Sequence, residues 1–216
     1  MCVTFAGLVR IFAFYKPNET PYLEAAWLSG TYYFDFMRFC WTNSAHEGSE
    51  HTIDEQTYPL EMQVKHSVSM NAAGKMSDVK FIIISYFFVE VKRSNVRMEP
   101  IAKALSTVWE INSCTEDVKP FPLKQLFDQF ASEFYSYGMS SMNHLTTTST
   151  MDTLRFIYPC EIPIGTLQMN EFRKIQHNNA HNPHESMAIS QRLNVRFNHY
   201  NCHRRSVRIE NNRKLC

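Results

Sequence analysis

The sequence predicts a single domain that is mainly β, of the α+β kind, on three observations. The chain has 216 residues, of which 44% are hydrophobic, and this is enough for one sizeable core. Runs of β-branched and aromatic residues dominate its first half. Helical apolar spacing is confined to a few short segments. Many strands with few helices therefore indicate a sheet-based domain.

Four segments have the composition of β-strands: Val3–Tyr15, Gly30–Trp41, Tyr58–His66 and Val79–Val91. The second is an almost continuous run of strand-forming residues, with Thr, Tyr and Phe repeated. The fourth is the longest apolar run of the chain, but it is too short to span a bilayer. It therefore predicts a buried strand.

Short helices and polar loops are predicted for the rest of the chain. Apolar residues recur at helical spacing in Pro100–Glu110, Leu123–Phe130 and Leu167–Ile175. The first of these begins with a proline, which is favoured in the first turn of a helix. Two polar stretches have the composition of surface loops: Gly138–Thr153 and His177–Glu185.

The overall charge and the N-terminus limit the classes of partner and compartment. A formal net charge of +1 gives no strong field to attract nucleic acid or an anionic membrane. Met1–Tyr15 is apolar, but it has no basic start and no small-residue cleavage site. We therefore expect a strand rather than a signal peptide, which favours the cytoplasm and leaves secretion open. The partner is unknown, with a protein as the open choice.

The cysteines carry no metal-binding or redox signature. All six are scattered without a CxxC pair: Cys2, Cys40, Cys114, Cys160, Cys202 and Cys216. This pattern favours reduced thiols, although an even number leaves disulfides open. Cys40 lies inside a predicted central strand, so we expect it to be a buried thiol without a disulfide partner.

Several motifs in a fixed order resemble one family. Gly48–Thr52 reads GSEHT and precedes Tyr58–His66, which reads YPLEMQVKH. Upstream, Leu28–Tyr32 and Met37–Trp41 have the form L-x-G-x-Y followed by a strand that ends in FCW. These segments are similar to the signature of the α-class carbonic anhydrases. Weaker matches follow in the family's order, so the resemblance covers roughly residues 20 to 207.

The resemblance implies a fold, a cofactor and a reaction. It implies a central twisted, mostly antiparallel sheet with a few short peripheral helices. It also implies a single domain over residues 1–216, in which the family's N-terminal segment has no counterpart. Members of the family hold Zn²⁺ with three histidines and hydrate carbon dioxide reversibly.

The residues at the implied zinc-ligand positions are Arg38, Cys40 and Gln63. A guanidinium offers no lone pair and repels a cation, and one thiol with one neutral amide does not complete a zinc site. We therefore expect no zinc and no catalytic residues. The resemblance then indicates an inactive relative that acts as a binding or interaction module. The alternative is a zinc-dependent carbonate dehydratase, as family membership by itself implies.

The resemblance assigns roles to six further residues. Thr146 and Glu50 match the family's pair of a gatekeeper threonine and its glutamate. Glu61 matches the carboxylate that orients a ligand histidine, and His51 and His66 match structural histidines. Lys65 replaces an apolar residue of the carbon dioxide pocket. A buried guanidinium is costly unless it is paired, so we expect Arg38 to pair with Glu61 or Glu50, or else to reach solvent.

Overall fold

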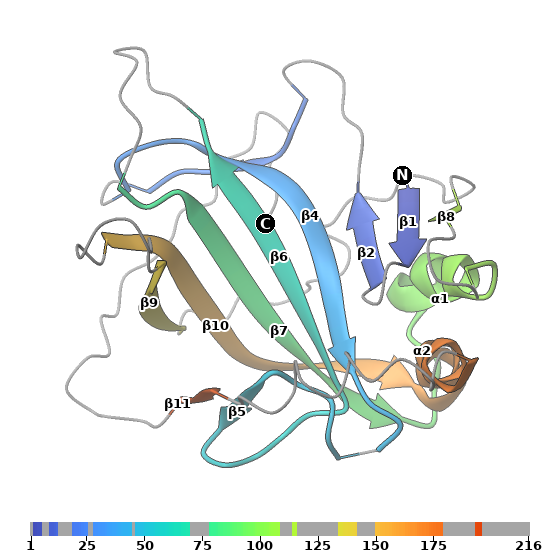
Figure 1. Cartoon of the computed structure of the whole chain (residues 1–216). Coiled ribbons are helices and arrows are strands. Elements are labelled where there is room, and N and C mark those ends of the chain that lie inside the picture. The colour runs from blue at the N-terminus through green and yellow to red at the C-terminus, as the bar shows by residue number, and fades with distance from the viewer. Residues whose placement is uncertain are drawn as a thin grey trace.

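One large, strongly curved sheet forms the body of the molecule (Figure 1). The structure is a computed structural model, and it describes residues 2–5, 9–12, 19–25, 28–44, 46–69, 78–108, 114–115, 134–141, 150–178 and 193–195. Within these residues, the large sheet has nine strands, and two further strands pair separately.

The strands of the large sheet run in the order β8-β1-β2-β4-β6-β7-β10-β9, and β3 pairs with the side of β4. Their bounds are β1 Cys2–Phe5, β2 Val9–Phe12, β3 Tyr22–Leu23, β4 Tyr32–Trp41, β6 Leu60–Val68, β7 Phe81–Val91, β8 Cys114–Thr115, β9 Tyr135–Ser141 and β10 Thr150–Gly165. Neighbouring strands are antiparallel except for β7 and β10, which are parallel. The separate pair, β5 (His51–Ile53) and β11 (Leu193–Val195), is also parallel.

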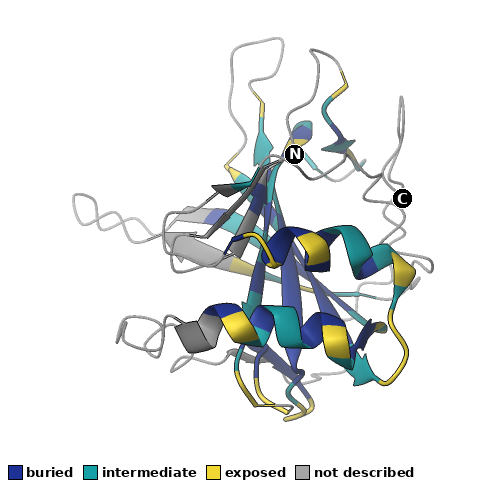
Figure 2. Cartoon of the chain, turned by 90° about the vertical axis from the view of Figure 1, so that its right-hand side faces the viewer, coloured by how far each residue is buried: buried dark blue, intermediate teal, exposed yellow. Residues whose placement is uncertain are grey.

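Two short helices cover one face of this sheet (Figure 2). They are α1 (Glu99–Leu105), which follows the 3₁₀ turn η1 (Val96–Met98), and α2 (Thr166–Asn178). Their buried residues, among them Ile101 and Phe172, join the main hydrophobic core. Phe172 packs against the rings of Phe39 and Trp41, so α2 is fixed to β4 by aromatic contacts.

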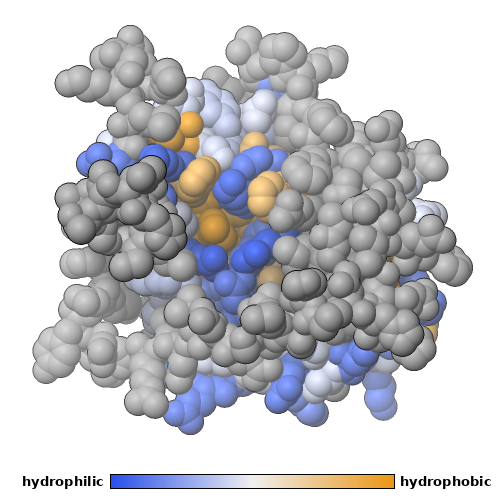
Figure 3. All heavy atoms as spheres, viewed as in Figure 1, coloured by the Kyte–Doolittle hydropathy of each residue, from blue (hydrophilic) through white to orange (hydrophobic). Residues whose placement is uncertain are grey.

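The side chains of the central strands alternate between this core and the opposite face. On β6, Leu60, Met62 and Val64 lie in the core. The residues between them point to the other face, because successive side chains of a strand alternate. Seen from the side of Figure 1, hydrophilic and hydrophobic side chains lie next to one another over the middle of the molecule (Figure 3). The helices thus complete the main core on one face, whereas the other face carries polar groups beside a second, smaller hydrophobic cluster that includes Phe87 and Ile157.

The structure confirms the predicted fold class and the three central strands. The predicted strands Gly30–Trp41, Tyr58–His66 and Val79–Val91 correspond to β4, β6 and β7, with ends shifted by about two residues. The predicted helix Leu167–Ile175 lies within α2. The predicted helix Pro100–Glu110 is shorter than expected, because α1 ends at Leu105.

Two other sequence predictions were wrong in part. Val3–Tyr15 contains two strands rather than one, and they pair antiparallel with Cys2 opposite Phe12. An apolar run alone does not distinguish one long strand from a hairpin. The predicted polar loop Gly138–Thr153 contributes its ends to β9 and β10, which pair antiparallel with each other. Leu123–Phe130 lies outside the described residues, and so does His177–Glu185 except for its first two residues, which end α2.

Candidate functional site

The polar face of β4 and β6 carries the residues that the sequence singled out. In the antiparallel register of these strands, Arg38 lies opposite Gln63 and Cys40 lies opposite Glu61. Side chains directly opposite each other on one face are near neighbours. The structure therefore brings together all three positions that the resemblance assigns to zinc ligands: Arg38, Cys40 and Gln63.

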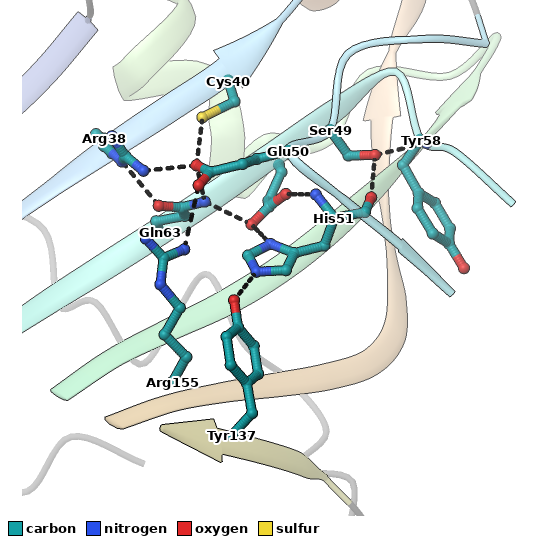
Figure 4. A network of polar contacts seen from close by, with 10 residues as sticks. Arg38, Cys40, Ser49, Glu50, His51, Tyr58, Gln63, Tyr137 and Arg155 are labelled. Carbon is teal, nitrogen blue, oxygen red and sulfur yellow. Dashed lines mark hydrogen bonds and ion pairs between the residues drawn. The ribbon is translucent and has the colours of Figure 1, made fainter. Parts of the chain in front are cut away.

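A tight approach of the chain places Glu50 above these strands. Gly48 lies so close to Pro59 that an added Cβ would stand 2.1 Å from the Pro59 carbonyl oxygen. The next residue, Ser49, is buried and accepts a hydrogen bond from the amide of Tyr58 while its own amide donates to the Tyr58 carbonyl. These contacts fix the segment before β5, so the Glu50 side chain points toward Arg38 (Figure 4).

Arg38, Glu50 and Gln63 form a closed set of hydrogen bonds. Arg38 donates from Nη2 to Glu50 Oε2 at 2.6 Å and from Nε to Gln63 Oε1 at 2.7 Å. Gln63 in turn donates from Nε2 to Glu50 Oε2 at 2.7 Å. Of the partners expected for Arg38, the structure shows Glu50 and not Glu61. The Arg38 side chain keeps 26% exposure, so the ion pair is only partly shielded from solvent.

Cys40 is a free thiol beside the same carboxylate. Its Sγ lies 3.9 Å from Glu50 Oε2, and the residue is partly rather than fully buried. Burial and, to a smaller extent, the nearby Glu61 carboxylate raise the pKa of the Cys40 thiol well above its usual value. The thiol therefore stays protonated at neutral pH.

Glu61 and His51 form a fully buried pair beneath this set. The Glu61 carboxylate accepts hydrogen bonds from the His51 amide at 2.9 Å, and it lies 2.7 Å from His51 Nδ1. Gln63 Nε2 also donates to Glu61 at 2.7 Å. Burial by itself raises the pKa of Glu61, but the contacts with His51 and Gln63 outweigh it and lower that pKa below its usual value.

Tyr137 on β9 completes this buried chain of contacts. Its hydroxyl lies 2.6 Å from His51 Nε2. Burial raises the pKa of Tyr137 to about 12, so the hydroxyl keeps its proton. An ionised carboxylate only accepts hydrogen bonds, so Nδ1 of His51 donates to Glu61. The chain Tyr137–His51–Glu61 thus links β9 and β5 to β6.

Arg155 on β10 is a site residue that the sequence did not reveal. Its Nη1 lies 3.4 Å from Glu50 Oε1, and its side chain is only 9% exposed. Figure 4 shows it reaching from β10 toward Glu50 and Gln63. No motif marks this position, because Arg155 stands in an apolar strand and lies 105 residues from Glu50 along the chain. Its only signal was a charge inside a buried strand.

Lys65 and His66 occupy different environments at the next positions of β6. Lys65 forms an ion pair with Asp35 at 3.0 Å, and its ammonium lies over the ring of Phe81 at 4.2 Å from the centroid. His66 points into the opposite face and packs edge-on against Phe34. Burial lowers the pKa of His66 to about 3, so its ring is neutral. Its two ring nitrogens have no hydrogen-bond partner among the described residues.

Thr146, the expected partner of Glu50, lies outside the described residues. Over the described part of the chain, no three His, Cys, Asp or Glu side chains gather into a group that could hold a metal ion. No helix in that part is long and apolar enough to cross a membrane.

Comparison with known proteins matches the sequence of this chain to one family. The family model of eukaryotic-type carbonic anhydrase matches residues 8–211. Mouse carbonic anhydrase 4 is 26% identical over 135 residues, which are 62% of this chain and 43% of that protein. Mouse carbonic anhydrase 15 is 26% identical over 148 residues, which are 64% of this chain and 44% of that protein. The match thus spans less than half of the length of either relative.

Proposed function

Because this chain belongs to the eukaryotic-type carbonic anhydrase family, we propose that it is an inactive member of that family that acts as a binding module. The observation that carries this proposal is the Arg38 guanidinium, which lies at an implied zinc-ligand position and contacts Glu50 at 2.6 Å. The match of one family model to residues 8–211 supports a single domain.

The residues at the implied ligand positions do not fit a zinc ion. Arg38 has no lone pair to offer, and its positive charge opposes a divalent cation. Cys40 could bind zinc as a thiolate, but one thiolate does not complete a zinc site. Gln63 already uses its amide oxygen for Arg38 and its amide nitrogen for Glu50 and Glu61. A catalytic zinc site needs three protein ligands and one open position, and this set supplies none of the usual three histidines.

The remaining polar groups support a structural role for the former site. Glu61 keeps its hydrogen bonds although the resemblance assigns it to orienting a ligand histidine that is now Gln63. Glu50 accepts from Arg38 and Gln63. Buried polar groups that are fully paired rigidify a fold, whereas a half-satisfied set destabilises it. Arg38 and Gln63 together supply donors to both carboxylates, in the place where a metal and its histidines would act.

The test is zinc content and carbon dioxide hydration of the same purified protein. We expect far less than one zinc per chain after incubation with zinc salt and dialysis, and a hydration rate equal to that of buffer. A zinc-loaded carbonic anhydrase treated identically is the positive control. Stoichiometric zinc with catalysed hydration would instead establish the alternative, a zinc-dependent carbonate dehydratase, and it would overturn the proposal.

A further inference from the structure

We propose that the corner of the molecule at which both helices begin is a docking surface for an acidic, partly apolar segment of a partner protein. This docking corner consists of residues 92–97, which lead from β7 into η1, and of residues 166–169, the first turn of α2. The inference rests on the proposed function, because it names the class of partner that the binding module would hold. Two exposed aliphatic side chains, a fixed backbone and a local excess of positive charge carry it.

Two large aliphatic side chains lie in solvent at the docking corner. Val96 is 84% exposed and Leu167 is 72% exposed, whereas the only other exposed large apolar side chain among the described residues, that of Tyr33, is 39% exposed. The chain neighbours of the two, Asn95 and Gln168, are hydrogen-bonded to each other, so Val96 and Leu167 belong to one part of the surface. Single exposed apolar residues are ordinary, but exposed apolar residues that lie together mark interaction surfaces.

The backbone that carries these side chains is held in place by buried contacts. The buried Gln168 accepts hydrogen bonds from the amides of Asn95 and Gly165 at 2.9 and 3.0 Å, and its Nε2 donates to the Asn95 carbonyl at 2.7 Å. Gly165 packs so closely on the chain that an added Cβ would lie 2.6 Å from the Cα of Ser94. A surface that is already ordered loses little conformational entropy when a partner binds.

Positive charge gathers at the same corner. Residues 92–97 contain Lys92, Arg93 and Arg97 and no acidic residue, although the whole chain has a net charge of only +1. Lys92 and Arg93 are exposed, and Figure 2 shows their loop beside the starts of both helices. The carboxylates that flank the segment along the chain, those of Glu90 and Glu99, each form an ion pair within the protein. The docking corner therefore presents cations next to two apolar side chains.

This combination favours an acidic protein segment over other partners. Carboxylates complement Lys92 and Arg93, and apolar side chains between them cover Val96 and Leu167, as in interfaces with an apolar centre and a polar rim. Nucleic acid would use the charges but would leave the aliphatic side chains in water. A lipid surface binds in proportion to the apolar area that it buries, and two aliphatic side chains supply little. A second copy of this chain would place like charges opposite each other across a symmetric contact.

The experiment selects binders from a phage-displayed library of random peptides, with the purified full chain as the target. The enriched peptides are synthesised with a fluorescent label, and their dissociation constants are measured by fluorescence anisotropy. We expect the enriched peptides to combine Asp or Glu with apolar residues and to bind saturably. Added salt should weaken their binding, because it screens the charged contacts.

Two variants test the two parts of the docking corner. Arg93→Glu reverses a charge and Leu167→Gln removes an aliphatic contact, and each should weaken peptide binding by about tenfold or more. Both side chains are exposed, so both variants should keep the unfolding temperature of the parent. The matched controls are Lys80→Glu and Tyr33→Gln, which should bind as the parent does. Lys80 precedes β7 and Tyr33 is near the start of β4, at the opposite end of the sheet.

Three results would overturn the proposal. The first is a selection that enriches no peptide, or only peptides without acidic residues. The second is equal affinity of the enriched peptides for the parent and for both variants. The third is sedimentation with phosphatidylserine vesicles that depends on Arg93 and Leu167 in the absence of peptide binding, because the partner would then be a lipid surface.

Zinc content and hydration rate, measured on the same samples, separate the two proposals. Peptide binding that depends on the docking corner in a protein with stoichiometric zinc and catalysed hydration would overturn only the proposed function. Absence of zinc and of hydration, together with absence of peptide binding, would overturn only the docking corner.

Discussion

A single guanidinium, that of Arg38, decides the chemistry of the polar face. It donates to Gln63 on the neighbouring strand β6 and to Glu50 on the segment before β5. A histidine at the same place would offer a lone pair to a metal, whereas arginine offers only donors. Position 38 on β4, where the resemblance implies a metal ligand, therefore holds an arginine that forms an ion pair with Glu50.

Replacing Arg38 by Ala should destabilise the fold. The variant leaves Glu50 with Gln63, Cys40 and the long contact to Arg155, so we expect a loss of about 1.5–3 kcal/mol in the free energy of unfolding, the scale of hydrogen bonds to charged groups. Partial exposure of Arg38 keeps the loss below that of a fully buried pair. Urea unfolding measures it. Lys103→Ala, which breaks an exposed pair with Glu99, is the control and should change stability by under about 0.5 kcal/mol.

His66 should make stability depend on pH below neutrality. The pKa of His66 is about 3 in the folded protein, against an ordinary value of 6.5. Between these two pH values the unfolded chain binds a proton at His66 and the folded chain does not. Stability therefore falls as pH drops from 6.5, by up to about 1.4 kcal/mol per pH unit. In His66→Phe this slope should disappear, because phenylalanine does not titrate and suits the apolar contact with Phe34.

The measurement for His66 is urea unfolding at several values between pH 5 and 7. This range lies above the ordinary carboxyl pKa of 4.5, so the lowered pKa of Glu61 does not contribute there. The stability that Glu61 adds is present above that value and is lost only as pH falls further. His46→Gln serves as the control, because His46 is exposed. If the free energy of unfolding of His66→Phe still falls with pH in this range, a group other than His66 causes the pH dependence.

At the scale of elements, a short segment before β5 holds the acidic group over the sheet. Gly48 packs against the backbone of Pro59, and Ser49 exchanges two hydrogen bonds with Tyr58. The segment needs a glycine because no Cβ fits between the two backbones. The position of Glu50, and hence of its ion pair with Arg38, depends on this close approach.

Gly48→Ala should therefore cost far more than an ordinary glycine substitution. The new Cβ would lie 2.1 Å from a backbone oxygen that cannot rotate away, so we expect a loss of about 3 kcal/mol or more. Thermal unfolding measures this loss. Gly30→Ala is the matched control, since its Cβ would meet only the side chain of Val68, at 3.0 Å. Equal unfolding temperatures for the two variants would contradict the packing argument.

At the scale of the whole molecule, the core and the polar face use opposite sides of the same strands. The helices α1 and α2 bury the apolar side chains of β4 and β6, while Arg38 and Gln63 lie on the other face. Substitutions at the polar face therefore leave the main core intact, since each strand residue faces only one side. This separation allows the family fold to persist while the implied zinc ligands differ.

Histidines at all three implied ligand positions should restore zinc affinity. In Arg38→His, Cys40→His, Gln63→His the three side chains would converge, because Arg38 lies opposite Gln63 in the register and Cys40 follows on the same face. Zinc content by mass spectrometry should rise toward one per chain. Carbon dioxide hydration should recover much less, because Lys65 and Arg155 keep charges on this face. The control, Cys40→His alone, should bind no stoichiometric zinc.

The sequence by itself predicted the fold class and the three central strands of the sheet, and the structure confirms them. Strand composition predicted β4, β6 and β7, and the spacing of two residues between Arg38 and Cys40 placed them on one face. Periodicity did not predict the hairpin of β1 and β2, because an apolar run has the same pattern in both arrangements.

Only the tertiary structure decided the partners of the charged groups. The sequence did not distinguish between Glu61 and Glu50 as the partner of Arg38. In the structure the partner is Glu50, because the close packing of Gly48 on Pro59 places Glu50 beside Arg38. Glu61 contacts His51 and Gln63 instead. No motif marks Arg155 as a site residue, because the parallel pairing of β7 and β10 joins segments that lie far apart along the chain. Local patterns determine which residues share a face, but the packing of distant segments determines which charges meet.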